Sequence, residues 1–325
     1  MKLSKIAVFT SGGDSPGMNA ALRAVVRAAR YYQLEVEGIY RGYEGMIDDD
    51  FIPLDERSVA RIVDKGGTII KSARSEAFRT KEGRKQAYNN LQKHKIDALI
   101  GIGGDGTFTG LHVFNKEFGI PVIGIPGTID NDIFGSDYTI GFDTASNTAI
   151  QAIDRIRDTA TSHNRLFLIE VMGRDAGFIA LRCAIASGAK AVMLPEKHTE
   201  PEALLAKIKL GAQKRKSSNI VIVSEGNKNG NAQELAQQLQ LMDDSFDIKV
   251  TVLGHVQRGG PPSAYDRLLA SRLGVGSIEA LKAGKSDVMV GVLNEKMVFT
   301  PLEKAIKENH RINDEMMKLI EILSI

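Results

Sequence analysis

Three short segments, rich in glycine and acidic residues, each follow an apolar stretch of the chain. They read TSGGDSPGMNA (10–20), DALIGIGGDGTFTG (97–110) and GIPGTIDNDI (124–133). Gly12 and Gly13 in the first segment allow a tight turn and a close approach of the backbone to a ligand. Backbone amides at the start of a following helix would then attract an anion. A plain strand-to-helix turn, capped by Asp14 or Ser15, explains this first segment equally well.

The second segment places Gly101, Gly103 and Gly106 in the GxGxxG spacing of dinucleotide-binding turns. A dehydrogenase would need an acidic residue at the end of the next strand, about 20 residues on, to bind a ribose hydroxyl. We expect that strand to end in Gly124–Gly127, which contains no acid. Asp105 would also face a pyrophosphate of like charge unless a cation lay between them, which indicates a Mg²⁺ ligand. The dehydrogenase interpretation is therefore rejected.

The third segment carries Asp130 and Asp132, two residues apart. Phosphoryl transfer to a hydroxyl group needs a carboxylate that accepts the hydroxyl proton, which typically accelerates the reaction by ~10²–10⁴-fold. Thr128 could donate a hydrogen bond to a phosphate beside it. The alternative is an Asx turn at the end of a strand, which is the better interpretation of an isolated Asp-Asn-Asp sequence.

Several cationic and polar residues also stand beside glycines at expected strand ends. The arginines among them are Arg74, Arg165, Arg174 and Arg258. A guanidinium group binds phosphate oxygens with two parallel hydrogen bonds, which lysine cannot do. Glu225 could accept hydrogen bonds from sugar hydroxyls. His255 could bind a sugar phosphate, although a single histidine is more often structural.

The elements that would position these residues alternate between short apolar runs and amphipathic stretches. The runs predict strands at 6–9, 36–40, 98–102, 122–125, 166–171, 191–194, 220–223, 250–253 and 288–293, and the stretches predict helices that include 18–31, 145–159, 201–214 and 263–283. Continuous apolar runs, each followed by a helix, are typical of strands buried on both faces of a parallel sheet. The predicted fold class is α/β with two doubly wound, Rossmann-like domains, in which ligands bind beyond the carboxyl ends of the strands.

The composition excludes several other classes of protein. The 325 residues include 42 Lys and Arg against 40 Asp and Glu, a net charge of +2, which does not support nucleic-acid binding. No apolar run approaches the roughly 18 residues of a membrane-spanning helix. Cys183 is the only cysteine, so an internal disulfide is impossible, and we expect a reducing, cytoplasmic location.

The motifs GGDSPGMNA, IGGDGT, GIPGTIDND, GFDT, EVMGR and GHVQRGG occur along nearly the whole chain, from about Ile6 to about Val292. In this order they resemble the motifs of the bacterial ATP-dependent 6-phosphofructokinases. IGGDGT alone is less specific, because NAD kinases and lipid kinases share a similar turn. The resemblance implies transfer of the terminal phosphate of MgATP to the 1-hydroxyl of fructose 6-phosphate, the committing step of glycolysis. It also implies an ATP-binding domain (1–141 plus 257–304) and a fructose 6-phosphate-binding domain (142–256 plus 305–325), with the active site in the cleft.

The resemblance further implies the roles of individual residues. ATP would be bound by Gly12, Tyr43, Arg74, Ser75, Gly103, Gly104, Asp105, Gly106 and Thr107, with Asp105 at the magnesium ion. Asp130 would be the catalytic base, assisted by Thr128 and Asp132, while Arg74 and Arg174 stabilise the transferred group. Fructose 6-phosphate would be bound by Thr128, Ile129, Asp130, Arg165, Met172, Gly173, Arg174, Glu225, Lys249, His255, Val256, Gln257 and Arg258. Arg165 would act in the substrate site of a neighbouring subunit, which implies a homotetramer.

The chain departs from the family pattern in two places. Lys249 stands where an arginine is usual, so the charge is kept but the two-bond contact with the 6-phosphate is lost. An effector site for ADP or phosphoenolpyruvate would be formed by Arg23, Arg27, Arg157, Gly188, Lys190, Lys214 and Lys216. Within it, Glu56 replaces an arginine, Arg61 an aspartate, and Lys190 an acidic ligand of the effector's Mg²⁺. We expect weak activation by MgADP and reduced inhibition by phosphoenolpyruvate; the alternative is surface drift with regulation intact.

Two other functions remain to be weighed. Pyrophosphate-dependent phosphofructokinases resemble this sequence but usually carry Asp at the position of Gly106 and Lys at the position of Gly127. Both positions are glycine here, which favours ATP. A nucleotide sensor without catalytic activity is the second alternative, and the presence of Asp105 and Asp130 argues against it.

Overall fold

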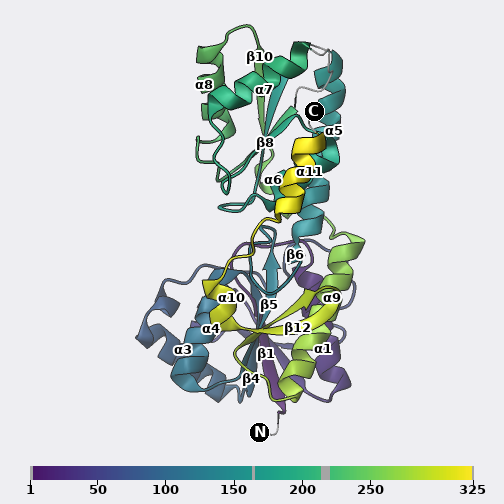
Figure 1. The fold of residues 1–325 in the computed structure, drawn as a ribbon. Coiled ribbons are helices and arrows are strands. Elements are labelled where there is room, and N and C mark those ends of the chain that lie inside the picture. The colour runs from purple at the N-terminus through teal and green to yellow at the C-terminus, as the bar shows by residue number, and fades with distance from the viewer. Residues whose placement is uncertain (1–2, 163–164, 214–219, 324–325) are drawn as a thin grey trace. The chain divides into compact units, whose positions relative to one another are not determined.

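The computed structural model describes residues 3–162, 165–213 and 220–323 (Figure 1). The chain divides into two compact units. Unit 1 consists of Met1–Ile129, Ile133–Thr144 and Arg258–His310, and unit 2 of Asp130–Asp132, Ala145–Gln257 and Arg311–Ile325. The chain therefore leaves unit 1 and returns to it more than once. Which ligand each unit binds stays a prediction.

The described residues of unit 1 contain an eight-stranded sheet in the order β12-β11-β5-β4-β1-β2-β3, with β6 paired to β5. Its strands are β1 (Lys5–Thr10), β2 (Glu35–Ile39), β3 (Phe51–Leu54), β4 (Ala98–Gly103), β5 (Val122–Thr128), β6 (Ile140–Gly141), β11 (Val288–Leu293) and β12 (Lys296–Pro301). The expectation of a purely parallel sheet is wrong at both ends of this order, because β3 is antiparallel to β2 and β12 is antiparallel to β11.

The antiparallel strand β12 arises from a tight turn. Asn294 and Glu295 connect it to β11, and both have positive φ values, 48° and 63°. Two consecutive residues in the left-handed region form the hairpin turn that best matches the twist of the flanking strands. Asn-Glu is a weaker signal for this turn than Asn-Gly, which explains why the sequence pattern did not predict β12.

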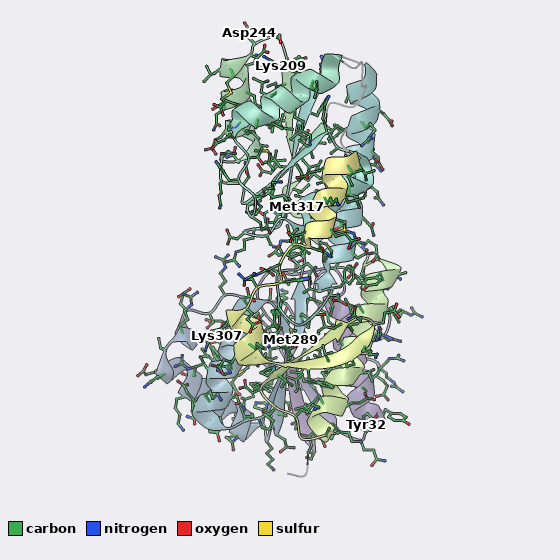
Figure 2. The ribbon with its side chains drawn as sticks, in the orientation of Figure 1. Tyr32, Lys209, Asp244, Met289, Lys307 and Met317 are labelled. Carbon is green, nitrogen blue, oxygen red and sulfur yellow. The ribbon has the colours of Figure 1, made fainter. Side chains whose placement is uncertain are left out.

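Helices cover both faces of the unit 1 sheet. Alternate side chains of β1 divide between them: Ile6 and Val8 pack with α1 (Met18–Tyr31) and α9 (Ala264–Lys282), whereas Ala7 and Phe9 lie in the opposite cluster. That second cluster includes residues from the helices α2 (Gly42–Ile47), α3 (Lys81–Lys93), α4 (Asp105–Phe118) and α10 (Leu302–Lys307). Met289 of β11, which is labelled in Figure 2, also belongs to it. Figure 1 shows α1 and α9 side by side, in agreement with their contacts. The doubly wound arrangement predicted from sequence is confirmed.

Unit 2 contains a smaller, parallel sheet of four described strands in the order β10-β7-β9-β8. Its strands are β7 (Arg165–Val171), β8 (Ala191–Met193), β9 (Ile220–Ser224) and β10 (Asp247–Val252), and its helices are α6 (Phe178–Ser187), α7 (Pro201–Gln213), α8 (Ala232–Met242) and α11 (Asp314–Leu323). Apolar residues of α7 and α8 cover one face, while α6 contacts β8 and β9 and is itself contacted by α11. Helix α5 (Phe142–Ser162) begins in unit 1 and continues in unit 2.

The short 3₁₀ helices η1 (Ala77–Arg79) and η2 (Gly254–Arg258) complete the described elements. The helix predicted at 18–31 is confirmed at both ends, and the one predicted at 263–283 differs by one residue at each end. In the part of the chain that the structure describes, no helix has the length and apolar character needed to cross a membrane.

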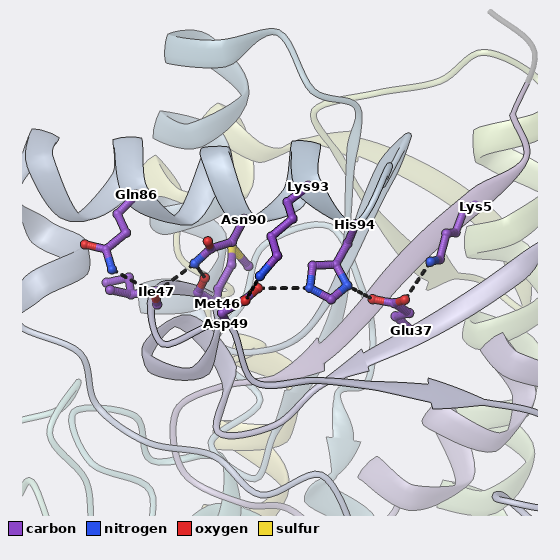
Figure 3. Close-up of polar contacts among 9 residues, drawn as sticks. All are labelled: Lys5, Glu37, Met46, Ile47, Asp49, Gln86, Asn90, Lys93 and His94. Atoms are coloured by element: carbon purple, nitrogen blue, oxygen red, sulfur yellow. Dashed lines mark hydrogen bonds and ion pairs between the residues drawn. The ribbon is translucent and has the colours of Figure 1, made fainter.

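A chain of charged side chains links the end of α3 to β2 and to the loop before β3 (Figure 3). His94 Nδ1 lies 2.8 Å from Glu37 Oε2, and His94 Nε2 lies 2.9 Å from Asp49 Oδ1. Lys5 Nζ donates to Glu37 at 2.6 Å, and Lys93 donates to Asp49. A neutral imidazole has a single N–H, so His94 can donate to both carboxylates only when it is protonated. The network therefore joins four separate segments: β1 through Lys5, β2 through Glu37, the loop before β3 through Asp49, and the end of α3.

Asp49 in this network should affect stability in a pH-dependent way. The hydrogen bond from Lys93 holds the pKa of Asp49 below its ordinary value of 3.8, with a further contribution from His94. A carboxyl group of this kind stabilises the fold above the unfolded-state pKa and loses that contribution as the pH falls. We expect Asp49→Asn to lower the free energy of unfolding by about 1 kcal/mol at neutral pH, and the difference from wild type to shrink below about pH 4.

Urea unfolding of both proteins at a series of pH values measures this difference. Asp64→Asn, at an exposed position of the same unit, is the matched control. A difference that stays constant or grows as the solution is acidified would contradict the assigned role of Asp49.

Candidate functional site

The first glycine-rich segment forms the turn between β1 and α1. Gly12 has a φ of 81° and Gly17 a φ of 109°, values in the left-handed region that favours glycine. Gly17 is the N-cap of α1, and no side chain in the described part of the chain caps this helix. The interpretation of Asp14 or Ser15 as a capping residue is therefore wrong. The start of α1 can instead accept an anion.

The second glycine-rich segment lies directly against the first. Gly103 ends β4, and Gly104 is the N-cap of α4, which also has no side-chain cap from the residues described. A Cβ atom on Gly103 would lie 2.3 Å from Thr107 Oγ1 and 2.5 Å from the Ser11 carbonyl oxygen, so only glycine allows the two turns to touch. A Cβ atom on Gly106, in contrast, would meet no described atom within 4 Å. One side of the paired turns is therefore open.

Asp105 lies in the first turn of α4 and is half-buried. Within the described ranges, no group of three or more His, Cys, Asp or Glu side chains could hold a metal ion. A cation at Asp105 would thus take most of its ligands from phosphate oxygens and water. Mg²⁺ is commonly held in this way beside a nucleotide, so the residues present fit this ion.

The buried side chain of Tyr43 supports the second turn. Its hydroxyl donates a hydrogen bond of 2.6 Å to the Thr107 carbonyl oxygen. Its ring stacks on Phe78 with the ring centroids 4.0 Å apart, and burial raises the pKa of the hydroxyl, which therefore remains a donor. The sequence did not predict this supporting contact, and a direct contact with ATP stays a prediction.

The segment that carries Arg74 and Ser75 is held against the first turn. The hydroxyl of Ser72 donates to the Gly12 carbonyl oxygen at 2.8 Å. Ser75 Oγ accepts a hydrogen bond of 3.2 Å from the Phe78 amide, which fixes the chain just after Arg74. The Arg74 side chain is exposed. This arginine is thus attached, through its neighbours, to the turn expected to bind phosphate.

The third segment places Thr128 beside the second turn. Strand β5 continues to Thr128, so the expectation that it ends within Gly124–Gly127 is wrong. The extension is possible because β6 pairs with the end of β5, and Thr139 Oγ1 donates to the Thr128 carbonyl oxygen at 2.7 Å. A Cβ atom on Gly104 would lie 3.8 Å from Thr128 Cβ. Three turns at the carboxyl ends of neighbouring strands therefore meet in unit 1.

Asp130 and Asp132 follow Thr128 and Ile129 in the chain and belong to unit 2. Asp130 is 7% exposed, which is unusual for an aspartate. Asn131, between them, has a φ of 56°, the conformation of a tight turn. A turn and a functional carboxylate are both compatible with this local geometry.

Arg258 lies across the first turn. Its Nη1 atom donates to the Asp14 carbonyl oxygen at 3.0 Å, and a Cβ atom on Gly13 would lie 2.8 Å from the same nitrogen. The sequence resemblance assigns Arg258 to the sugar phosphate. In the structure its guanidinium group lies beside the backbone expected to bind ATP, and Gly13 is required for that approach.

Five of the residues expected to bind the sugar phosphate come together in unit 2: Met172, Gly173, Arg174, Glu225 and Gln257. The buried side chain of Gln257 accepts a hydrogen bond of 2.9 Å from the Met172 amide. The Arg174 amide donates to Glu225 Oε2 at 3.3 Å, and Arg174 has a φ of 55°. The side chains of Arg174, His255 and Val256 are exposed. Hydrogen bonds therefore fix the backbone of Met172 and Arg174, while the side chain of Arg174 reaches solvent.

Arg165 and Lys249 both pair with one carboxylate that the sequence analysis missed. Arg165 Nε and Lys249 Nζ each lie 2.7 Å from an oxygen of Asp247. Hydrogen bonds from Lys249 and then Arg165 hold the pKa of Asp247 below its ordinary value. Alternate residues of a strand share a face, so Asp247 two positions before Lys249 was a usable signal. A phosphate group bound here would have to replace Asp247 as the partner of these cations.

The residues expected to bind an effector are only partly described. Arg157 Nη1 lies 3.9 Å from where a Cβ atom on Gly188 would stand, and Lys190 is buried in the same unit. Among the described residues, Arg157 Nε and Nη2 are buried without a hydrogen-bond partner. Arg23 and Arg27 lie on α1 in unit 1, and Lys214 and Lys216 lie outside the described residues.

Known proteins match this chain along nearly its whole length. The Phosphofructokinase (PFK) family profile matches residues 5–281. The chain is 52% identical over 322 residues to the ATP-dependent 6-phosphofructokinase of Cytophaga hutchinsonii, covering 99% of this chain and 98% of the relative. It is 51% identical over 323 residues to ATP-dependent 6-phosphofructokinase 1 of Thermus thermophilus, covering 99% of this chain and all (100%) of the relative.

The structure of a phosphofructokinase from Saccharomyces cerevisiae superposes on this structure with a TM-score of 0.89 and a sequence identity of 36%. The match covers 99% of this chain and 47% of the yeast chain. The profile match alone covers well over half of the sequence. Fold, motif order and identity agree along the whole length. The chain belongs to the phosphofructokinase family.

Proposed function

We infer that this chain is an ATP-dependent 6-phosphofructokinase, which transfers the terminal phosphate of ATP to the 1-hydroxyl of fructose 6-phosphate. The observation that carries the inference is the 52% identity over nearly the full length to a protein of that name. As a glycolytic enzyme it would act in the cytoplasm, where its buried Cys183 would remain a thiol.

We assign the nucleotide to the paired turns of unit 1. The amides at the starts of α1 and α4 would bind the phosphates of ATP, with Arg74 supplying positive charge. Mg²⁺, held by Asp105 and the phosphates, would neutralise the charge that develops during transfer. The open side at Gly106 supports a nucleotide there, because the bare backbone leaves room for a phosphate.

We assign the proton transfer to Asp130. In a loose phosphoryl-transfer transition state the protein mainly positions groups and stabilises charge, and a single carboxylate accepts the hydroxyl proton. Thr128, at the end of β5, would donate to the transferred group, and Asp132 would assist. The low exposure of Asp130 supports this role, because a buried aspartate is uncommon in proteins.

We assign fructose 6-phosphate to the Met172–Arg174 segment with Glu225 and the η2 residues. Arg165 and Lys249 would bind the 6-phosphate of the fructose 6-phosphate in the site of a neighbouring subunit. The active assembly would therefore be a homotetramer with shared sites. Their present partner, Asp247, is half exposed, and exposed ion pairs of this kind are weak. A phosphate dianion could therefore displace it.

The pyrophosphate-dependent alternative is disfavoured at Gly106 and Gly127. A Cβ atom on Gly127 would lie 3.1 Å from Ile102 and 3.2 Å from Met18, so the lysine usual in those enzymes would need its neighbours to shift. A coupled assay for fructose 1,6-bisphosphate, run with ATP and with pyrophosphate, tests the inference directly. Activity with pyrophosphate but not with ATP would refute it, and so would the absence of activity with both donors.

The base assignment predicts the effect of Asp130→Asn. The amide keeps the shape of the side chain but cannot accept the proton, so kcat should fall by roughly 10²–10⁴-fold while the affinity for ATP changes little. Steady-state kinetics and nucleotide binding measured on the same preparation provide the comparison. A variant that retains most of its kcat removes Asp130 from this role.

The donor assignment predicts the effect of Gly106→Asp. The side chain would occupy open space, so folding should be unaffected, but its charge would oppose the α-phosphate. We expect kcat/KM for ATP to fall by roughly 10²-fold. Gly106→Asn is the matched control, since it adds the same volume without charge and should retain much more activity. Equal losses in the two variants would show that size, not charge, matters.

The effector residues predict altered regulation. Lys190 adds a positive charge where an acidic group would help to bind Mg²⁺, so the metal-dependent effector should bind poorly. Arg157, with buried nitrogen atoms available, supports some residual binding of a small anion. We expect weak or absent activation by MgADP and reduced inhibition by phosphoenolpyruvate. Initial-rate curves against fructose 6-phosphate, with and without each effector, measure this, and a large shift by millimolar ADP would contradict it.

A further inference from the structure

Asp266 is a fully buried acidic residue, 0% exposed, that has no place in the site described so far. It lies in the first turn of α9, within unit 1. Its Oδ1 accepts a hydrogen bond of 2.9 Å from the Gly141 amide, and its Oδ2 accepts from the Thr144 amide at 2.8 Å and from the Thr144 hydroxyl at 2.5 Å. Three donors from one short segment therefore converge on one carboxylate.

A second set of hydrogen bonds closes this arrangement. Thr144 Oγ1 accepts from the Ser263 amide at 2.8 Å, and Ser263, the N-cap of α9, accepts from the Asp266 amide at 3.2 Å. The Ser263 hydroxyl in turn donates to Asp143 at 2.7 Å. The starts of α5 and α9 are thus tied to each other, and the Asp266 carboxylate is the acceptor at the centre.

The segment that Asp266 holds is the one that supports Thr128. Gly141 and Ile140 form β6, which pairs with Thr128 and Gly127 at the end of β5. The residue before β6, Thr139, donates its hydroxyl to the Thr128 carbonyl oxygen at 2.7 Å. In the part of the chain that is described, β6 is the strand that borders this end of β5. Any shift of β6 would therefore move the Thr128 backbone.

The same segment also contacts the first glycine-rich turn. A Cβ atom on Gly141 would lie 2.7 Å from Ser15 Cβ, and a Cβ atom on Gly17 would lie 2.6 Å from Ile140 Cγ2. Strand β6 is consequently packed between the turn expected to bind phosphate and the turn that leads to the catalytic base. Close packing of this kind transmits small displacements, because interiors have little free volume.

We propose that Asp266 is a positioning residue for phosphoryl transfer: by fixing β6 it sets the backbone of Thr128 and the direction in which the chain enters Ile129 and Asp130. It contacts no substrate. The inference rests on the roles proposed above for Thr128 and Asp130. A displacement of about 1 Å in such a group can reduce the rate by up to roughly 10²-fold, so the effect should be large enough to measure.

The chemistry of the carboxylate matters as much as its location. Burial raises the pKa of Asp266 to about 6, while the hydrogen bonds from Thr144 and Gly141 lower it. The three donors that converge on the two oxygens fit the ionised form of this group. An ionised carboxylate accepts at both oxygens. An asparagine would turn its amide hydrogens toward at least one of the three donors and would leave that donor without an acceptor.

The test uses two pairs of variants in the full-length enzyme. Asp266→Asn and Thr144→Val remove the carboxylate and the hydroxyl with almost no change in volume. Thr144→Ser keeps the hydroxyl, and Ser277→Ala removes a buried hydroxyl elsewhere on α9 that donates to the Gly274 carbonyl oxygen of the same helix. Values of kcat and KM for both substrates are normalised to the folded fraction, measured by circular dichroism at the assay temperature.

We expect kcat to fall about 10-fold or more in Asp266→Asn and Thr144→Val, with KM for fructose 6-phosphate within about twofold of wild type. Thr144→Ser should recover most of the loss, and Ser277→Ala should behave as wild type. The double variant Asp266→Asn/Thr144→Val should lose little more than Asp266→Asn alone, because the two groups act as one unit.

The outcomes separate this inference from the assigned activity. Wild-type enzyme that does not phosphorylate fructose 6-phosphate would overturn the proposed function. Active wild type, with Asp266→Asn and Thr144→Val retaining normal kcat per folded molecule and losing only thermal stability, would overturn the positioning role alone. If Asp266→Asn does not fold, the comparison of Thr144→Val with Thr144→Ser still decides: equal kcat values in these two reject the proposal.

Discussion

The candidate site of unit 1 depends on the direct contact between the turns that follow β1 and β4. A Cβ atom on Gly103 would lie 2.3 Å from Thr107 Oγ1 and 2.5 Å from the Ser11 carbonyl oxygen. Any side chain at this position would therefore force the two turns apart. Parallel strands end at the same edge of a sheet, and this contact brings the starts of α1 and α4 together at that edge. Two helix starts without side-chain caps from the described residues then lie at the same edge, where we propose that the phosphates of the nucleotide bind.

The surrounding polar contacts preserve this geometry rather than take part in the reaction. Tyr43 holds the second turn through the Thr107 carbonyl oxygen, and Ser72 holds the first through Gly12. Asp266 does the same for Thr128 through β6. Phosphoryl transfer requires mainly position and charge from the protein. In this chain, hydrogen bonds behind the candidate site therefore fix the backbone of groups that we assign to substrate binding.

Unit 2 presents its charges differently. Arg165 and Lys249 are exposed or nearly so and share the carboxylate of Asp247, while Arg174 projects from a strained backbone position with a φ of 55°. Exposed ion pairs are weak, so these cations can exchange one anionic partner for another at small cost. Lys190, in contrast, is buried, and the Nε and Nη2 atoms of the half-buried Arg157 are also shielded from solvent.

The sequence alone was sufficient for the fold class, for the helix at 18–31 and for the family, and it is the source of the proposed roles of Asp105 and Asp130. These features depend on local periodicity and on long motifs. Only the tertiary structure decided that β3 and β12 are antiparallel, that β5 continues to Thr128, and that Asp247 and Asp266 hold residues far away in the chain. Asp266 and Gly141 are 125 positions apart. A hydrogen bond over that separation leaves no periodic signal, because it depends on how two elements pack and not on the neighbours of either residue.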